Sequence, residues 1–271
     1  MRLPFSPWHL FLAPVAAVML VPFVWMVIIS LETEQQARSF PPVLAPSTLH
    51  FSNYATAWNS VPFGDFFLNS AMYSLATVAG NLLFCSLAAY AFARIKFFGR
   101  EVLFVVLLAT LMVPFQVILI PTFLIVKKMG LVDNVGGLIM PNLCSAFGIF
   151  MLRQFFRTLP IELEEAARID GTSRLGILFK IVLPLSLPAL ATLGIIQFMW
   201  SWNDFLWPLI IIDSASHAPL QLGLSTLQGA HSTQWNLLMA GTVMSLIPMM
   251  AIFLFAQRWF IRSIAFTGIK Q

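Results

Sequence analysis

The stretch Glu164–Pro184, EEAARIDGTSRLGILFKIVLP, places three acidic and three basic residues around a glycine at position 171. The 271-residue chain that surrounds it is 59% hydrophobic and only 10% charged. Soluble domains carry about a quarter charged residues, so this composition is typical of an integral membrane protein. The stretch must therefore lie in a segment that leaves the bilayer.

The local pattern of this stretch predicts a helix, a turn and a second helix. Acidic residues crowd the first turns, where the helix dipole favours negative charge. Gly171 can adopt the left-handed conformation that ends a helix. Thr172 or Ser173 can cap the next helix, which runs to Pro184 at the membrane entry.

Working outward, we predict an all-α integral membrane protein with a single transmembrane domain over residues 1–271 and six transmembrane helices. Each apolar run is long enough, at about 20 residues, to cross a hydrocarbon core. The runs are Leu10–Ile29, Leu68–Phe92, Val102–Val126, Gly136–Phe156, Leu185–Ile212 and Leu237–Ala256. We interpret the first run as a retained span rather than a cleaved signal, because no small-residue cleavage pattern follows it.

The basic residues predict the orientation of these spans, because cytoplasmic loops carry the excess of Lys and Arg. With the N-terminus inside, all but Arg38, Lys127 and Lys128 of the 15 Lys and Arg residues fall on the cytoplasmic side. Both termini are then cytoplasmic, and residues 157–184 form an inside loop between spans four and five. Residues 31–67 and 213–236 form the long outside loops. The bases are scattered between apolar runs, which argues against a nucleic-acid partner.

The inside loop resembles the EAA signature of the membrane subunits of bacterial ABC importers. That signature is Glu-Ala-Ala, three residues, Gly, nine residues, Ile, one residue and Leu-Pro. Here it reads Glu165-Ala166-Ala167, then Gly171, then Ile181, then Leu183-Pro184, with both spacings kept. The flanking RQFFRTLPIELEEAARIDGTS and the later WNDFLWPLI (Trp202–Ile210) are similar to the maltose-type carbohydrate subgroup.

The resemblance implies a coupling helix that docks in a cytoplasmic ATPase subunit. It assigns this role to Glu164, Glu165, Ala166, Ala167, Arg168, Asp170 and Gly171. Glu165 would pair with a base on the ATPase, Gly171 would permit the turn, and Glu164, Arg168 and Asp170 would contact the rim. The implied partners are a second homologous permease, two ABC ATPases and an extracytoplasmic binding protein, in a bacterial or archaeal cytoplasmic membrane with its lipid.

ATP and Mg would be used by the partner subunits, and we expect no cofactor on this chain. A phosphate-binding loop of the form GxxxxGK[ST] is missing from the sequence, since no Gly is followed by Lys.

A polar stripe in span five is a candidate substrate pathway. Gln197, Ser201 and Asp204 recur at helical spacing, and they are flanked by Trp200, Trp202 and Asn203. Hydrogen-bonding groups beside aromatic rings suit a sugar. Asp204 and Asn203 could instead stabilise packing against a partner or cap a helix break before Pro208. An intramembrane acid is costly and needs a cavity or a partner in either case.

The outside loop at 213–236 is predicted, by the same resemblance, to reach the binding protein, with Gly223, Gln228 and Gly229 as contacts. A plain connector is the alternative. Cys85 and Cys144 fall in apolar runs and are interpreted as buried small hydrophobes rather than a disulfide or metal pair.

The predicted function is a permease subunit of an ATP-driven importer for a sugar or oligosaccharide, working by alternating access. An importer of a phosphorylated polyol such as glycerol 3-phosphate is the alternative. An ion-coupled carrier would need more intramembrane charge. An intramembrane enzyme is disfavoured because the four histidines show no ligand spacing and no catalytic motif occurs.

Overall fold

A computed structural model describes residues 8–229 and 233–267, and the regular structure of this part of the chain is helical apart from one isolated bridge between Gln228 and Thr233. It divides into two compact units. The first comprises the described residues of 1–64 and 223–247, and the second those of 65–222 and 248–271. Each unit is described by itself.

The first unit has a small apolar core between α3 (Ser52–Ser60) and the start of α15 (Trp235–Thr267), whereas the apolar residues of α1 are exposed along most of the helix. The C-terminal end of α1 is fixed by Asn53, which donates to the carbonyls of Ser30 and Glu32 at 2.9 and 2.8 Å. The helices that begin in this unit are α1 (Trp8–Ser30), α2 (Glu34–Ala37), α3 (Ser52–Ser60), α4 (Phe63–Arg94) and α15 (Trp235–Thr267). The two short helices α2 and α3 lie in the long outside loop predicted at 31–67.

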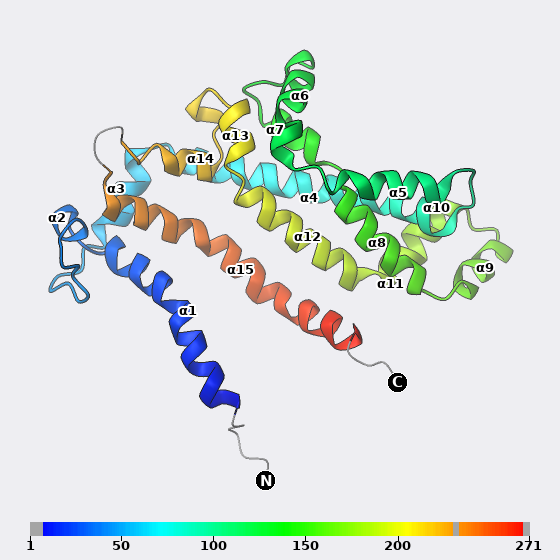
Figure 1. The fold of residues 1–271 in the computed structure, drawn as a ribbon, viewed down its shortest axis with the longest axis horizontal. Coiled ribbons are helices and arrows are strands. Elements are labelled where there is room, and N and C mark those ends of the chain that lie inside the picture. The colour runs from blue at the N-terminus through cyan, green and yellow to red at the C-terminus, as the bar shows by residue number, and fades with distance from the viewer. Residues whose placement is uncertain (1–7, 230–232, 268–271) are drawn as a thin grey trace, which may run out of the picture. The chain divides into compact units, whose positions relative to one another are not determined.

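The second unit contains most of α4 and the remaining helices (Figure 1). They are α5 (Arg100–Thr110), α6 (Phe115–Lys128), α7 (Val135–Ile139), η1 (Met140–Asn142), α8 (Ala146–Thr158), α9 (Glu162–Ile169), α10 (Arg174–Ile177), the π-helical η2 (Leu178–Val182), α11 (Leu183–Leu185), α12 (Leu187–Trp202), α13 (Leu206–Ile211), η3 (Ala215–His217) and α14 (Leu220–Ser225), the last reaching into the first unit. A buried apolar cluster joins α4, α8, α9, α10, η2 and α12 and includes Cys85, Leu152, Ile177 and Leu193.

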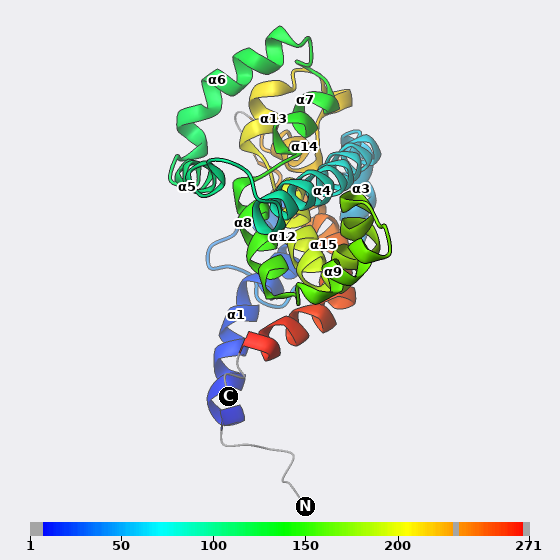
Figure 2. The ribbon, with the colours of Figure 1, turned by 90° about the vertical axis from the view of Figure 1, so that its right-hand side faces the viewer.

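Three of the predicted spans are bent rather than straight. The described residues hold three helices that could each cross a membrane, and up to six spans when each bent pair counts as one. The bend between α5 and α6 is 102° and is visible in Figure 2. It falls at Pro114, as expected for a residue that lacks a backbone N–H. The fold class is therefore all-α integral membrane, with broken spans.

The predicted span Leu185–Ile212 is not one continuous helix, and its second break falls before Pro208, where the sequence offered Asp204 and Asn203 as caps. The helix bends by 82° at Ser186, and α12 ends at Trp202 before α13 resumes at Leu206. Pro208 explains the second break, because it cannot donate to the carbonyl four residues earlier and its ring clashes there. The predicted span Gly136–Phe156 is likewise interrupted, with a 43° bend between η1 and α8.

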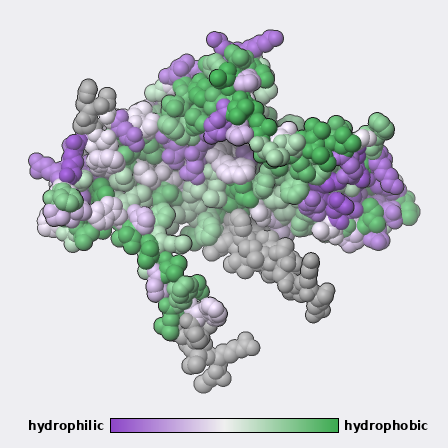
Figure 3. Space-filling view, in the orientation of Figure 1, coloured by the Kyte–Doolittle hydropathy of each residue, from purple (hydrophilic) through white to green (hydrophobic). Residues whose placement is uncertain are grey.

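Surface hydropathy separates two kinds of helix within the second unit (Figure 3). Apolar side chains cover α5, where Val102, Val105 and Val106 are all more than half exposed. Hydrophilic side chains gather instead over α9. This contrast fits α5 as a lipid- or partner-facing helix and α9 as a helix outside the bilayer.

Candidate functional site

The loop helix α9 and its turn form as the sequence predicts. Gly171 has a φ of +77°, in the left-handed region, and its N–H donates to the carbonyl of Arg168 at 3.0 Å. The side chain of Ser173 caps α10 by accepting from the N–H of Gly176 at 3.2 Å. The result is a short acidic helix, a tight turn and a second helix that leads toward α12.

Glu164 lies inside the protein, which corrects its prediction as a rim contact. Its side chain is buried, and its Oε1 lies 2.8 Å from Nε of Arg94. The hydroxyl of Tyr90 donates to Oε2 at 3.0 Å. Nη2 of Arg94 also donates to the carbonyls of Phe156 and Leu159 at 2.7 and 2.6 Å. We call Tyr90, Arg94 and Glu164 the clasp; it fastens α9 to α4 and to the end of α8.

The other predicted coupling residues lie on two faces of the loop helix and its turn, one buried and one exposed. Ala167, three residues after Glu164, is buried with it on the inner face. The exposed residues of the predicted set are Glu165, Ala166, Arg168, Asp170 and Gly171. Ile169 is 87% exposed beside them, although sequence reasoning gave it no partner role. The outer face of α9 therefore combines charge with an unpartnered apolar side chain.

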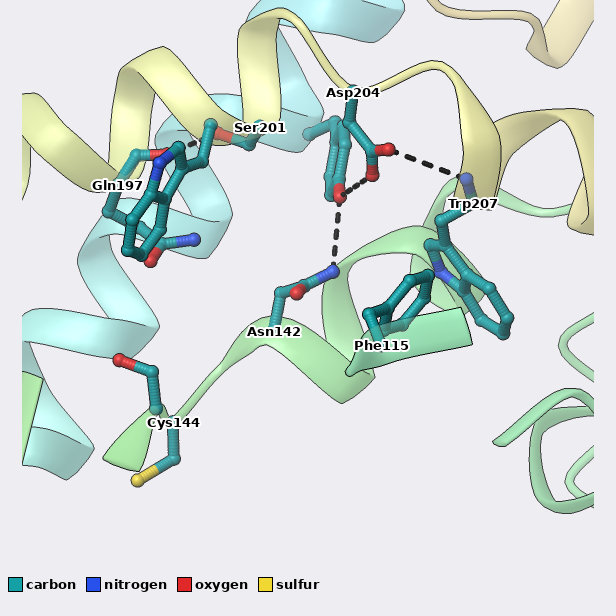
Figure 4. A pocket seen from close by; sticks show the side chains of 10 residues that line it. Phe115, Asn142, Cys144, Gln197, Ser201, Asp204 and Trp207 are labelled. Atoms are coloured by element: carbon teal, nitrogen blue, oxygen red, sulfur yellow. Dashed lines mark hydrogen bonds between the residues drawn. The ribbon is translucent and has the colours of Figure 1, made fainter. Parts of the chain in front are cut away.

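A cavity of about 360 Å³ lies within the second unit, around the break that follows α12 (Figure 4). It is lined by Tyr73, Phe115, Asn142, Cys144, Ser145, Gln197, Trp200, Ser201, Asp204 and Trp207. Four of the six predicted pathway residues are among them. Trp202 is instead buried in the core against Phe67 and Phe198, and Asn203 is exposed with its amide bonded to the carbonyl of Met199 at 2.8 Å.

Asp204 lines this cavity and also closes the helix break. Its Oδ2 accepts a hydrogen bond from the Tyr73 hydroxyl at 2.8 Å, and Oδ1 accepts from the N–H of Trp207 at 3.4 Å. Nδ2 of Asn142 donates to the same Tyr73 oxygen at 3.0 Å. Asp204 therefore caps the helix break, which is one of its two predicted roles, and its place in the cavity wall leaves the pathway role a prediction.

Sequence reasoning missed most of the wall that faces the polar stripe. Tyr73 and Phe115 carry no local signal, because only the fold brings their helices to α12, whereas Trp207 lies three residues after Asp204 and could have been added to the stripe. Asn142 is a polar residue within the apolar run Gly136–Phe156, and this position was a sequence signal that it could face a cavity. Cys144 is exposed at this cavity, which corrects its prediction as a buried residue, whereas Cys85 is buried; their sulfurs are 3.8 Å apart and both are free.

The outside loop, which we predicted to reach the binding protein, contains the short helices η3 and α14. Gly223 is buried within α14, which corrects its prediction as a contact residue, while Gln228 and Gly229 are exposed. The described residues include no group of three or more His, Cys, Asp or Glu side chains that could hold a metal ion.

Asp133 ties the start of that loop to the turn before α7. Its Oδ1 accepts from the N–H and hydroxyl of Ser214 at 2.9 and 2.8 Å and from the N–H of Asp213 at 3.1 Å. These hydrogen bonds, led by that from the Ser214 backbone, lower the pKa of Asp133 to about 2. Nδ1 of His217 lies 3.5 Å from the same oxygen.

Broken apolar spans, a polar cavity between them and a helix–Gly–helix in a polar loop define a multi-pass membrane transport subunit. Residues 81–266 match the family described as binding-protein-dependent transport system inner membrane component, and the chain belongs to this family.

Curated relatives agree with this assignment. The arabinooligosaccharides transport system permease protein AraQ of Halalkalibacterium halodurans is 37% identical over 88% of this chain and 86% of its own length. The sn-glycerol-3-phosphate transport system permease protein UgpE of Pectobacterium atrosepticum is also 37% identical, over 85% of each chain.

Solved structures agree as well. A chain of a bacterial ABC transporter that imports the acidic polysaccharide alginate matches with a TM-score of 0.79 and 27% identity, covering 94% of this chain and 99% of that one. A chain of the alginate transporter in complex with a pentasaccharide-bound periplasmic protein matches with a TM-score of 0.65 at 15% identity, which supports the fold alone.

Proposed function

We propose that this chain is one of two permease subunits of an ABC importer for a sugar or oligosaccharide, in the cytoplasmic membrane of a bacterium or archaeon. It forms the translocation path with the second permease and works by alternating access. Two ATPase subunits hydrolyse ATP with Mg on the cytoplasmic side, and an extracytoplasmic binding protein delivers the cargo. The chain itself is not an enzyme and binds no cofactor.

The geometry of α9 is the observation that carries this proposal. The clasp fixes the inner face of the helix to α4 and α8, so the helix cannot rotate freely. The outer face presents Glu165 and Arg168 around the exposed Ile169. A short helix held rigidly on one face and unpartnered on the other suits a groove in a soluble partner, and it can pass a push from that partner into α12.

A phosphorylated polyol is the second candidate cargo, because the UgpE relatives are as similar to this chain as the AraQ relatives are. The cavity beside Asp204 disfavours it, since none of its lining residues is Lys, Arg or His. Uptake assays with an arabinooligosaccharide and with glycerol 3-phosphate separate the two candidates.

The test of coupling uses the chain reconstituted in proteoliposomes with its second permease, ATPases and binding protein. Gly171→Pro forces a φ near −65° on a residue that needs +77°, so we expect the turn to be lost. Glu165→Lys reverses the exposed charge on α9. For both variants we expect normal membrane insertion, uptake reduced at least tenfold, and ATP hydrolysis that no longer responds to loaded binding protein.

Gly130→Pro is the matched control for the turn. Gly130 also has a left-handed φ, +73°, and its N–H also donates to the carbonyl three residues earlier at 3.0 Å, but it follows α6 on the predicted outside. We expect comparable local strain without uncoupling. Full uptake and stimulated hydrolysis in both Gly171→Pro and Glu165→Lys would refute the role of α9.

A further inference from the structure

The cavity beside Asp204 contains a buried hydrogen-bonding group that the protein itself does not use. Gln197 is 5% exposed and lines the cavity, and its carboxamide has no hydrogen-bond partner within residues 8–229 and 233–267. Its backbone carbonyl, in contrast, accepts from Ser201 at 2.8 Å. The residue is buried as a whole, but its amide atoms reach the open volume of the cavity, where a polar occupant can bind them. The free carboxamide therefore suggests an occupant that is polar.

The groups around Gln197 match a ring that carries hydroxyl groups. The Asp204 carboxylate has acceptor capacity beyond its bonds to Tyr73 and Trp207. Trp200 is 53% exposed on the same wall, so an aromatic face stands beside the polar groups. Figure 4 shows Gln197 on the helix before the break and Asp204 in the break itself, and both line the same cavity. A sugar ring needs this combination, because it has hydroxyl edges and apolar C–H faces.

The charged residues of the cavity lining favour a neutral cargo over an anionic one. Asp204 is the only Asp or Glu in its lining, and the lining contains no Lys, Arg or His to balance it. In a site of low dielectric a carboxylate repels another anion strongly. The cavity volume of about 360 Å³ lies at the small end of the usual range for small-molecule sites, roughly 300–1,000 Å³.

We propose that this cavity is a subsite for one ring of a neutral saccharide, so that this permease itself contacts the cargo and does not leave recognition to its partner. Gln197 and Asp204 bind the hydroxyl groups and Trp200 covers an apolar face. The proposal rests on the proposed function, and it adds the cargo class and the chain that binds it.

Cys144 supplies a probe that needs no variant, because it is exposed at the cavity while Cys85 is buried. The assembled transporter without binding protein is treated with a maleimide, and the labelled Cys144 peptide is quantified by mass spectrometry. We expect arabinotriose or maltotriose at millimolar concentration to slow labelling several-fold, and glycerol 3-phosphate to leave it unchanged. The absence of protection by any neutral sugar, or equal protection by the anion, would overturn the proposal.

Gln197→Met tests the residue that carries the inference, since it keeps the length of the side chain and removes the amide. We expect it to abolish protection by the neutral sugars. Thr192→Val, on the same helix, is the matched control, because its hydroxyl is already bonded to the carbonyl of Pro188 at 2.8 Å and does not line the cavity. Undiminished protection in Gln197→Met would refute the subsite. ATP-driven uptake by the wild-type transporter, measured in parallel, shows whether the proposed function stands independently.

Discussion

At the scale of the residue, the clasp is the contact on which the orientation of α9 depends. Both carboxylate oxygens of Glu164 have partners, and Arg94 satisfies two backbone carbonyls at the end of α8 as well. A buried ion pair need not add net stability, because both charges lose their hydration. Removing one partner is different, because the other charge stays buried without compensation, at a cost of about 3–5 kcal/mol.

We therefore expect Glu164→Ala and Arg94→Ala each to lower the thermal stability of the purified transporter strongly, while Arg94→Met combined with Glu164→Leu recovers much of the loss. Thermal unfolding of the two single variants and of Glu164→Ala/Arg94→Ala in detergent forms a double-mutant cycle for the pair. Glu162→Ala, an exposed acid in the same turn of α9, is the control and should have little effect. Additive losses in the cycle would show that the two side chains are not coupled.

The clasp also shows that the sequence predicts local structure but not long-range side-chain contacts. The helix–Gly–helix could be predicted because Gly171 and Ser173 act on their own neighbours along the chain. The direction of Glu164 could not, because it depends on Tyr90, which is 74 residues away and has no local relation to the loop. The same limit hid Tyr73 and Phe115 from the predicted pathway: the polar stripe on α12 was visible in the sequence, but its opposite wall comes from other helices.

At the scale of the element, the breaks in the spans show what hydropathy does not resolve. The run Leu185–Ile212 is apolar enough, despite its polar stripe, to be predicted as a single span by its length, yet the chain interrupts α12 after Trp202. Backbone groups freed inside a membrane must be satisfied by neighbours. Here the N–H of Asn203 bonds to the carbonyl of Met199 at 3.2 Å, and Asp204 accepts from Trp207. The break is thus compatible with the bilayer, and it exposes Asp204 to the cavity.

Asp133 anchors two neighbouring connections, and its lowered pKa predicts how this anchor depends on pH. Because the folded-state pKa of about 2 lies below the ordinary value of 3.8, the ionised carboxylate stabilises the fold above pH 4. That contribution declines as the pH falls from 4 to 2. We expect wild-type protein to melt at a higher temperature than Asp133→Asn at pH 6, with the difference shrinking toward pH 2 in parallel thermal scans. A difference that does not depend on pH would assign the effect to shape rather than to charge.

At the scale of the whole molecule, two sets of polar contacts near the ends of helices in the second unit are assigned by the predicted topology to opposite sides of the membrane. Asp133 and Ser214 meet where the predicted outside segments begin. Arg153 and Glu101, 2.9 Å apart, and the clasp join the predicted inside segments. The contacts of the first set join only segments predicted outside, and those of the second join only segments predicted inside. This grouping agrees with the predicted order of the spans. The excess of Lys and Arg then decides which set is cytoplasmic.

Two exposed side chains test this orientation directly. In a Cys144→Ser background, Ser216→Cys reports on the outside loop and Thr158→Cys on the inside loop. With a membrane-impermeant maleimide, we expect the cysteine introduced at position 216 to label in intact spheroplasts, and the one at 158 to label only after permeabilisation. The positive-inside bias predicts this result because all but three of the Lys and Arg residues would otherwise face outward. Labelling at 158 without permeabilisation would place α9 outside, where no ATP-driven partner could reach it, and would contradict both the topology and the coupling role.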